Sequence, residues 1–549
     1  MAAIHGGNQM ALNEDQKEMK EKEEQVREKD HSTTTDSNYK KIDVLAYNLK
    51  KAIDNYSVIS FDIFDTLLVR PYVRPIDLFI HMEKLYNVTG FTEARMMAER
   101  EIRRKSAATK DDITFDEIYE QIDSKYKWLK EKELAMEYDS LNARPFMKEI
   151  YNYACKKNKR MIIISDMYLS KQFLSEVLKK NGYTTFEQIY ISSEYGKTKG
   201  TGDLYKIALE DLNLSVKDIM NIGDNKYSDV IRPRKLGVNA FHVPKVFEFL
   251  SETDSKIEYF YKDRKEDIGT SIMLGLLAYQ SESSYKNYWY EFGYKYAGPL
   301  IFGYMQWLED QLKTREIDQV LFIARDGYTL EKVFKLIGSS EVHTDYLYLP
   351  RNIAREILNE DSEIAEKSKN EYRQYLKQFD LQGKKIAVID SVTYWWSSQK
   401  ALVHLLPEKE IIGYYWLVGP TEVEGLTFET FQKNHIHKLG EMIELFMTAP
   451  TPPVETITKG KPVFKKVDDA EEVRIKIYPD ISKGAIDFAK DYINSFKKIK
   501  GFFSCEMLMD WIKLFQSRPT EIDKISFFNI EHASDENHES YHKLMSYWY

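Results

Sequence analysis

The stretch VISFDIFDTLL, residues 58–68, decides the fold of the first half of the chain. Its apolar beginning is typical of a buried strand, and its carboxylates and threonine follow where that strand would end. In open parallel α/β sheets, side chains at the carboxyl ends of the strands face the ligand-binding crevice. Asp62 is the first of them, and a carboxylate in that position can act as a nucleophile.

Three later stretches place reactive side chains in a similar way. They are Ser165-Asp166 after the apolar run 161–164, Lys197 and Lys199 in a loop, and Gly223-Asp224 with Asp229 after the apolar run 219–222. In order and in chemistry, Asp62 and these stretches resemble the four motifs of the haloacid dehalogenase superfamily. Each motif alone is common by chance, but all four in this order are specific.

The resemblance implies a role for each catalytic residue. Asp62 would be the nucleophile that forms an aspartyl intermediate, and Ser165 would hydrogen-bond the transferred group. Lys199 would balance the charge at Asp62 and in the transition state. We prefer Lys199 over Lys197 because a small turn and a helix follow it, as in the family; Lys197 is a loop charge that could contact substrate.

The resemblance also implies a bound Mg²⁺. Its ligands would be Asp62, the main-chain carbonyl of Phe64 and Asp224, with Asp229 as a further ligand or as support. Magnesium prefers such oxygen ligands, and a cation is needed when one anion attacks another.

The sequence departs from the family pattern at Phe64. Family phosphatases carry a second Asp here, two residues after the nucleophile, as general acid and base. Its absence puts rapid phosphomonoester hydrolysis in doubt, unless the leaving group is good, as in a sugar 1-phosphate, or Asp65 or a cap residue replaces it. Family dehalogenases also lack this Asp. Their chemistry uses no cofactor, however, so it gives no reason to keep Asp224 and Asp229 as a metal site.

Several further residues are candidates for substrate binding: Asp65, Thr66, Asp166, Arg100, Arg325 and Asp326. Arg100, Arg103 and Arg104 share one helix face and could grip an anionic substrate, although a solvated face is the alternative. For Asp65, the alternative is a structural role in a turn.

Length and composition describe a globular protein with more than one domain. The chain has 549 residues, of which 43% are hydrophobic and 30% charged,. Its formal net charge of -9 argues against nucleic-acid binding, which requires basic surface,. Two cysteines make no disulfide framework, which fits a reducing compartment with the cytoplasm as the default,. No signal peptide and no integral membrane segment are predicted.

The chain is predicted to have three parts. Residues 1–41 are charged and poor in apolar anchors, which indicates a mobile leader with a transient helix at 13–29. Residues 42–253 alternate helices with short apolar runs, so they are predicted to form an α/β domain with a parallel, Rossmann-like sheet. Residues 254–549 are predicted to form a second Rossmann-type α/β domain with a helical C-terminal region.

No strand is expected between Asp62 and the run that begins at residue 161. This segment instead contains amphipathic helical patterns at 75–86, 92–105, 114–125 and 130–141. Thr114 and Glu117 have the spacing of a capping box. A helical insertion is therefore expected at about 71–145, and the resemblance implies that it is a cap that closes over the site and selects substrate.

The second half contains further strand-like runs at 319–324, 346–349, 385–390 and 411–418. A proline-rich loop at 445–461 is predicted to cover an edge of this sheet, and 481–515 and 541–549 to be helical. Asp326 and Asp390 could face each other at a switch-point crevice, where Arg325 could bind a phosphate. Turn capping is the alternative for these residues.

The favoured hypothesis is a Mg²⁺-dependent phosphatase that acts on a phosphorylated sugar or another small metabolite. The arrangement of cap, core and extra domain resembles large predicted hydrolases encoded near bacterial surface-polysaccharide genes. The alternative is a weakly active or inactive binding or scaffold protein in polysaccharide synthesis, whose second domain binds a nucleotide sugar or a protein partner.

Overall fold

A computed structural model describes residues 34–283, 286–338, 342–359, 363–381, 383–419, 423–433, 439–533 and 541–547. The transient helix predicted at 13–29 lies outside these residues, as does most of the predicted leader. Helix α2 (Thr34–Asp54) already begins inside the predicted leader, whose last residues are therefore helical. Leu49 and Ile53 of this helix are fully buried, which fixes its second half to the first domain.

The first sheet has five parallel strands in the order β5-β4-β1-β6-β7. They are β1 (Val58–Phe61), β4 (Arg160–Ser165), β5 (Gln188–Ile191), β6 (Ile219–Gly223) and β7 (Asn239–His242). The chain adds β4 and β5 on one side of β1 and then β6 and β7 on the other. Its direction therefore reverses beside β1, where such sheets bind ligands. The predicted parallel α/β fold is confirmed.

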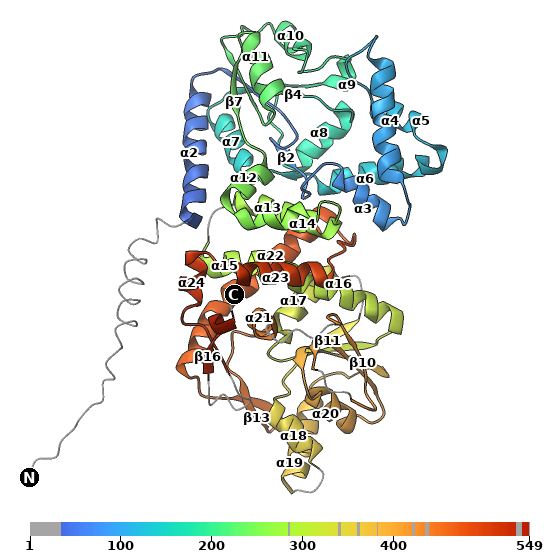
Figure 1. Cartoon of the computed structure of the whole chain (residues 1–549), viewed down its shortest axis with the longest axis vertical. Coiled ribbons are helices and arrows are strands. Elements are labelled where there is room, and N and C mark those ends of the chain that lie inside the picture. Colours follow the sequence, from blue (N-terminus) through green and yellow to red (C-terminus); the bar gives the residue numbers. More distant parts are fainter. Residues whose placement is uncertain are drawn as a thin grey trace, which may run out of the picture.

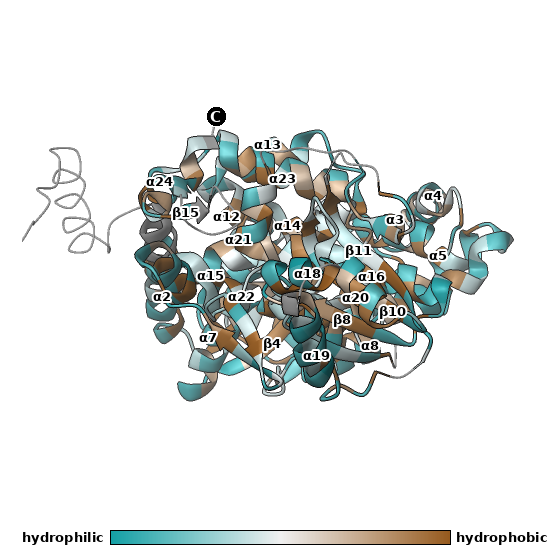
Figure 2. Cartoon of the chain, turned by 90° about the horizontal axis from the view of Figure 1, so that it is seen from below, coloured by the Kyte–Doolittle hydropathy of each residue, from teal (hydrophilic) through white to brown (hydrophobic). Residues whose placement is uncertain are grey.

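Alternate residues of β4 pack on opposite faces of this sheet, as the period of two requires. Ile162 and Ile164 belong to the same buried cluster as Leu204 and Ala208 of α10 (Asp203–Asp211). Ile163 belongs to the larger cluster, which includes α7 (Pro145–Lys156). Figure 2 shows the strands mainly in the brown of hydrophobic residues and outer helices such as α19 mainly in teal.

The insertion between β1 and β4 is helical, as predicted. It contains α3 (Asp77–Leu85), α4 (Phe91–Ser106), α5 (Phe115–Gln121), the 3-10 helix η1 (Ser124–Leu129) and α6 (Lys130–Ser140). The capping box is confirmed, because Glu117 N donates to Thr114 Oγ1 and Thr114 N donates to Glu117. The expectation of no strand is wrong in one respect: β2 (Leu68–Val69) and β3 (Asn142–Ala143) pair at the base of the cap. Two-residue strands are too short to show a periodic pattern.

The second sheet is also five-stranded and parallel, in the order β12-β11-β10-β8-β9. Its strands are β8 (Gln319–Ile323), β9 (His343–Leu347), β10 (Lys385–Thr393), β11 (Glu410–Val418) and β12 (Thr427–Thr430). Strand β12 was not predicted; it is short and only partly buried. The predicted second α/β sheet is confirmed, and its chain direction reverses between β8 and β10.

Two predictions near the C-terminus are wrong. The proline-rich segment 445–461 is not simply a loop, since it contains β13 (Val454–Thr458), which pairs with β14 (Lys461–Phe464). Val454 and Ile457 pack in the cluster of α18 (Arg351–Leu358) and α19 (Glu363–Leu376), so the hairpin covers helices rather than a sheet edge. The segment predicted as helical from residue 541 begins with β16 (Tyr541–Lys543), and only η5 (Leu544–Tyr547) follows as helix.

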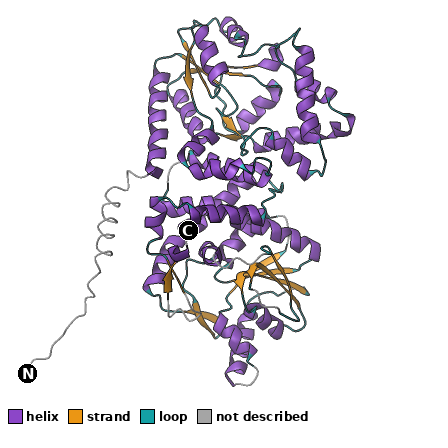
Figure 3. Cartoon of the chain, in the orientation of Figure 1, coloured by secondary structure: helices purple, strands orange, loops and turns teal. Residues whose placement is uncertain are grey.

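A layer of helices separates the two sheets (Figures 1 and 3). It includes α12 (Val246–Thr253), α13 (Ser255–Lys262), α14 (Ile268–Ser281), α15 (Tyr288–Phe292), α16 (Gly298–Arg315), α22 (Asp469–Phe496) and α23 (Cys505–Ser517). Helix α22 crosses the end of α15 at Gly484, where a Cβ would lie 2.2 Å from Tyr290 O, so only glycine allows this approach. No helix among the described residues is long and apolar enough to cross a membrane.

Buried polar contacts attach the first domain and its cap to the layer of helices between the two sheets. Arg144, which precedes α7, donates through Nε to Glu282 at the end of α14 (2.9 Å to Oε2) and through Nη1 to Asp65 O (2.6 Å). On the cap, Ser271 Oγ of α14 donates to Asp77 of α3 at 2.6 Å. The domain boundary predicted near residue 254 thus falls within a segment that packs on both halves.

We expect Arg144→Met to destabilise the protein by about 3–5 kcal/mol, because it leaves the buried Glu282 carboxylate without its cation. Denaturant unfolding measures the change. Arg160→Met is the matched control: Arg160 and Glu187 form an equally short ion pair (2.8 Å), but their side chains are 47% and 40% exposed. The control should lose less than about 1 kcal/mol. Equal losses in the two variants would contradict the structural role of the Arg144 pair.

Candidate active site

Asp62 lies at the carboxyl end of β1, with its main-chain N–H bonded to Ile222 O of β6 (3.0 Å). Two donors meet on one oxygen of its carboxylate: Ser165 Oγ at 2.9 Å and Lys199 Nζ at 2.6 Å from Oδ1. Among the described residues, no hydrogen bond to Asp62 Oδ2 is found. Asp62 is thus held through one oxygen, and its other oxygen remains available for attack on a substrate.

Lys199 bridges two carboxylates. Its Nζ lies 2.6 Å from Asp62 Oδ1 and 2.6 Å from Asp229 Oδ1, and its side chain is 3% exposed. Burial lowers the pKa of Lys199, but Asp229 and Asp62 outweigh that effect and raise the pKa well above its usual value. Lys199 is therefore charged. The structure places Lys197 elsewhere, on the surface near Asp111.

Three carboxylates gather beside this lysine. Oxygen atoms of Asp62, Asp224 and Asp229 all lie within 4.8 Å of one another. Gly223 permits the arrangement, because a Cβ there would lie 2.4 Å from Asp229 Cγ. Burial, with the charges of Asp62 and its acidic neighbours, raises the pKa of Asp224 to about 8.

This cluster fits a divalent cation. Its donors are all carboxylate oxygens, which Mg²⁺ prefers, and the raised pKa of Asp224 marks negative charge that Lys199 does not neutralise,. Lys245 lies 3.7 Å from Asp224 and 3.6 Å from Asp65, but its side chain is 45% exposed. The identity of the ion as Mg²⁺ and the share of the Phe64 carbonyl stay predictions.

The residues that follow Phe64 also lie at the site. Thr66 is buried, and its Oγ1 lies 3.4 Å from Asp224 Oδ1. Asp65 has a left-handed backbone (φ 53°), which directs its carboxylate towards Lys245. Both therefore lie beside the carboxylates of the predicted metal site, and Asp65 also serves the turn through its carbonyl bond to Arg144.

An aromatic ring occupies the position of the missing acid. The guanidinium carbon of Arg70 lies 4.4 Å from the centre of the Phe64 ring. Arg70 in turn pairs with Glu137 of the cap helix α6, with Nε 2.8 Å from Oε2. This position thus offers no proton to a leaving group, and it connects the nucleophile loop to the cap.

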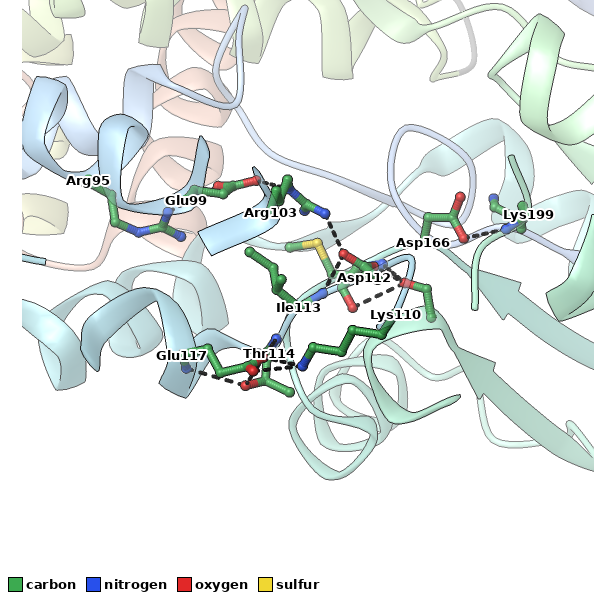
Figure 4. Close-up of polar contacts among 12 residues, drawn as sticks. Arg95, Glu99, Arg103, Lys110, Asp112, Ile113, Thr114, Glu117, Asp166 and Lys199 are labelled. Atoms are coloured by element: carbon green, nitrogen blue, oxygen red, sulfur yellow. Dashed lines mark hydrogen bonds and ion pairs between the residues drawn. The ribbon is translucent and has the colours of Figure 1, made fainter. Parts of the chain in front are cut away.

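A polar network ties the cap to the core beside Lys199 (Figure 4). Asp112, in the loop before α5, accepts hydrogen bonds from Arg103 of α4 and from Ser192 Oγ, which follows β5. Ser192 Oγ also accepts a bond from Met167 N (2.8 Å). The neighbouring Asp166 accepts a bond from Lys199 N (2.7 Å). The sequence analysis missed Asp112, because nothing in its local pattern indicates contacts so distant along the chain.

The structure places the remaining residues that were predicted to bind substrate away from Asp62 and Lys199. Arg100 is exposed on α4, where it lines a shallow depression with Glu83 and Met96. Arg104 is also exposed and pairs with Glu101 on its own helix (2.8 Å), so only Arg103 of that face reaches the cap loop. Arg325 and Asp326 lie at the carboxyl end of β8, in the second sheet.

Comparison with known proteins agrees with this arrangement of motifs. Residues 53–243 match the family model described as haloacid dehalogenase-like hydrolase. Over these residues the chain is similar to haloacid dehalogenase-like hydrolases. The predicted resemblance is confirmed, whereas the association with surface-polysaccharide genes stays a prediction.

Several solved structures are similar to about a third of the chain. One is a crystal structure of a dehalogenase, 17% identical, with a TM-score of 0.27, covering 35% of this chain and 85% of that one. The L-2-haloacid dehalogenase from Xanthobacter autotrophicus is 15% identical (TM-score 0.27; 34% and 77% covered). CbbY from Rhodobacter sphaeroides, in complex with phosphate, is 17% identical (TM-score 0.26; 34% and 86% covered). The chain matches none of the curated proteins with which it was compared.

We expect Mg²⁺ to raise the unfolding temperature of the wild-type protein, because an ion that binds only the folded state stabilises it by about 2.7 kcal/mol at a hundred times its Kd. Asp224→Asn should lose this increase, measured by calorimetry with and without Mg²⁺. Asp218→Asn, an exposed position just before β6, should keep it. An equal Mg²⁺ response in the Asp224 variant would exclude Asp224 as a ligand.

Asp112→Asn should destabilise the attachment of the cap by about 1–3 kcal/mol, because the partly exposed Arg103 and the buried Ser192 lose a charged acceptor,. Urea unfolding and limited proteolysis of the loop before α5 measure the effect. Asp111→Asn changes the adjacent carboxylate, which is more exposed and makes longer contacts (3.3 Å to Thr201 Oγ1 and 3.7 Å to Lys197 Nζ), and should have little effect. Similar results for both variants would contradict the specific role of Asp112.

Proposed function

We propose that this chain is a Mg²⁺-dependent phosphatase of the haloacid dehalogenase superfamily, acting on a phosphorylated sugar or a similar small metabolite through an aspartyl intermediate. The observation that supports the proposal is that Ser165 and Lys199 both donate hydrogen bonds to Asp62 Oδ1, beside three clustered carboxylates. The acidic cluster distinguishes this site from cofactor-free dehalogenase chemistry, which has no use for a metal site.

In the proposed reaction, Asp62 Oδ2 attacks the phosphorus atom and the bond to the leaving oxygen breaks, which leaves the phosphoryl group on Asp62. Water then hydrolyses the aspartyl phosphate and releases orthophosphate. Lys199 remains charged throughout and stabilises Asp62 and the developing negative charge. Ser165 holds Asp62 before the substrate binds and then donates its hydrogen bond to the transferred group.

The metal would be held by Asp62, Asp224 and Asp229, with the Phe64 carbonyl as a further ligand. When bound, it would neutralise phosphate charge that repels the Asp62 carboxylate. Asp166 positions Lys199 by accepting its main-chain N–H. Thr66 positions Asp224 by donating a hydrogen bond from its hydroxyl group to Oδ1.

The ring of Phe64 favours substrates whose leaving group departs without a proton from the enzyme, such as sugar 1-phosphates. The same observation supports a second candidate function. With an aromatic ring stacked on Arg70 in place of the acid, the domain would bind a phosphorylated ligand with little or no turnover. Under this second candidate function, the protein is a binding or scaffold component of surface-polysaccharide synthesis.

The proposal predicts orthophosphate release from a panel of sugar phosphates in the presence of Mg²⁺. Asp62→Asn should reduce release by on the order of a thousandfold or more, as expected when a nucleophile is removed. Lys197→Met, which alters the exposed loop lysine, should retain near wild-type activity. No release by folded, Mg²⁺-loaded wild-type protein would favour the binding function, and equal release by the Asp62 variant would exclude the aspartyl mechanism.

Phe64→Asp should restore the missing acid. General acid catalysis contributes about 10²- to 10⁴-fold, so turnover of alkyl phosphates should rise towards that range, while p-nitrophenyl phosphate, which has a good leaving group, should change little. Phe64→Asn has nearly the same shape but no titratable proton, and it serves as the control. If both variants changed the two substrates equally, Phe64 would not limit leaving-group protonation.

A further inference from the structure

The second sheet has a switch point of the same topological kind as the first. The chain places β9 and β10 on opposite sides of β8, so its direction reverses between β8 and β10. Asp326 lies three residues after the end of β8, and Asp390 lies next along β10 after Ile389, which pairs with Phe322 of β8. Both aspartates are partly exposed, so solvent reaches the point where ligands bind in such sheets,.

The two aspartates interact with each other and with a third carboxylate. Ser391 Oγ, from β10, donates a hydrogen bond to Asp326. Burial raises the pKa of Asp326 to about 6, with Glu444 of α21 (Gly440–Phe446) as the next cause. Burial and the charge of Asp326 raise the pKa of Asp390 well above its usual value. That Asp326 and Asp390 face each other stays a prediction.

Three arginines, Arg325, Arg351 and Arg474, lie near these carboxylates. Arg325 already has partners, since its Nη2 lies 2.9 Å from Thr448 Oγ1 and 2.6 Å from Glu471 Oε1. Arg474 of α22 is only 7% exposed, and its Nε has no hydrogen-bond partner among the residues that the structure describes.

Arg474 lies three residues after Glu471 on α22, and Glu471 pairs with Arg325, the residue before Asp326. Burial lowers the pKa of Arg474, as does the nearby charge of Arg325, while Glu471, Glu444 and Asp326 act in the opposite direction. An arginine remains charged in proteins, so a buried guanidinium with an unused donor is unfavourable unless a ligand satisfies it. This unpartnered donor, rather than the acidic cluster, is what points to a ligand.

The chemistry of the ligand follows from the groups present. A guanidinium binds phosphate through its planar fork of N–H donors. Helix α17 (Gly327–Ile337) begins at the switch point without a side-chain cap, so its positive end favours the same anion,. The partly exposed carboxylates are acceptors for hydroxyl groups. A phosphate beside several hydroxyl groups describes a phosphorylated sugar, either free or within a nucleotide.

We propose that the switch point of the second sheet is a separate binding site for a phosphorylated sugar, with the phosphate on Arg474 and the hydroxyl groups on Asp326 and Asp390. The site is independent of the chemistry at Asp62. Its residues come from the loop after β8, from β10 and from α22, none of which contributes to the first site.

Isothermal titration of the full chain tests the proposal, with Asp62→Asn as the background so that no probe is turned over. The probes are glucose 1-phosphate, uridine diphosphate glucose and inorganic phosphate. Arg474→Met should weaken the binding of one phosphorylated probe molecule per chain by about ten- to a hundredfold, the loss expected for a hydrogen bond to a charged group. Lys476→Met changes an exposed cation on the same helix and should have no effect.

Asp326→Asn keeps the shape of the side chain, and it tests the binding proposal independently if the Arg474 variant fails to fold. It should weaken binding of the sugar-containing probes but leave inorganic phosphate unchanged, since its carboxylate receives hydroxyl groups. Tighter binding of glucose 1-phosphate or of uridine diphosphate glucose would identify the source of the sugar phosphate. Absence of binding by every probe, or unchanged binding in both variants, would overturn the proposal. Because binding is measured without turnover, an inactive first site would not affect the result.

Discussion

The ammonium group of Lys199, held between Asp62 and Asp229, is the interaction on which the first site depends. Three carboxylates lie together in a buried position, where their repulsion is only weakly screened,. Lys199 neutralises the two that it contacts, which leaves the excess negative charge at Asp224. Burial and the charge of Asp62 raise the pKa of Asp224, and a divalent cation would offset both effects,.

The two sheets use the same topological position in different ways. In the first, Asp62 and Asp224 end the strands at the reversal point, and their cation, Lys199, is already paired. In the second, Asp326 and Asp390 hold the equivalent place, but the Nε of Arg474 remains without a partner. The helical layer between them binds the cap and the first domain through Asp77 and Arg144, so the orientation of the cap depends on the second half of the chain.

Much of the first site followed from local sequence. Strand ends could be read from apolar runs: Asp62, Ser165 and Asp224 each follow such a run, and Lys199 lies in the loop before α10. The structure gathers all four, although their catalytic and metal-binding roles stay predictions. Arg100 shows the limit of this reasoning, because helical spacing places three arginines on one face but does not say what that face meets.

The sequence by itself determined the two parallel sheets, the helical cap and the order of the reactive residues, because strand periodicity, capping and strand-end polarity are local properties. Only the tertiary structure decided that Asp112 connects the cap to the core, that Arg144 pairs with Glu282, and that Arg474 lies near Asp326. The physical reason is that buried charges are placed by partners far away in the chain, and no local pattern records which partner the packing will supply.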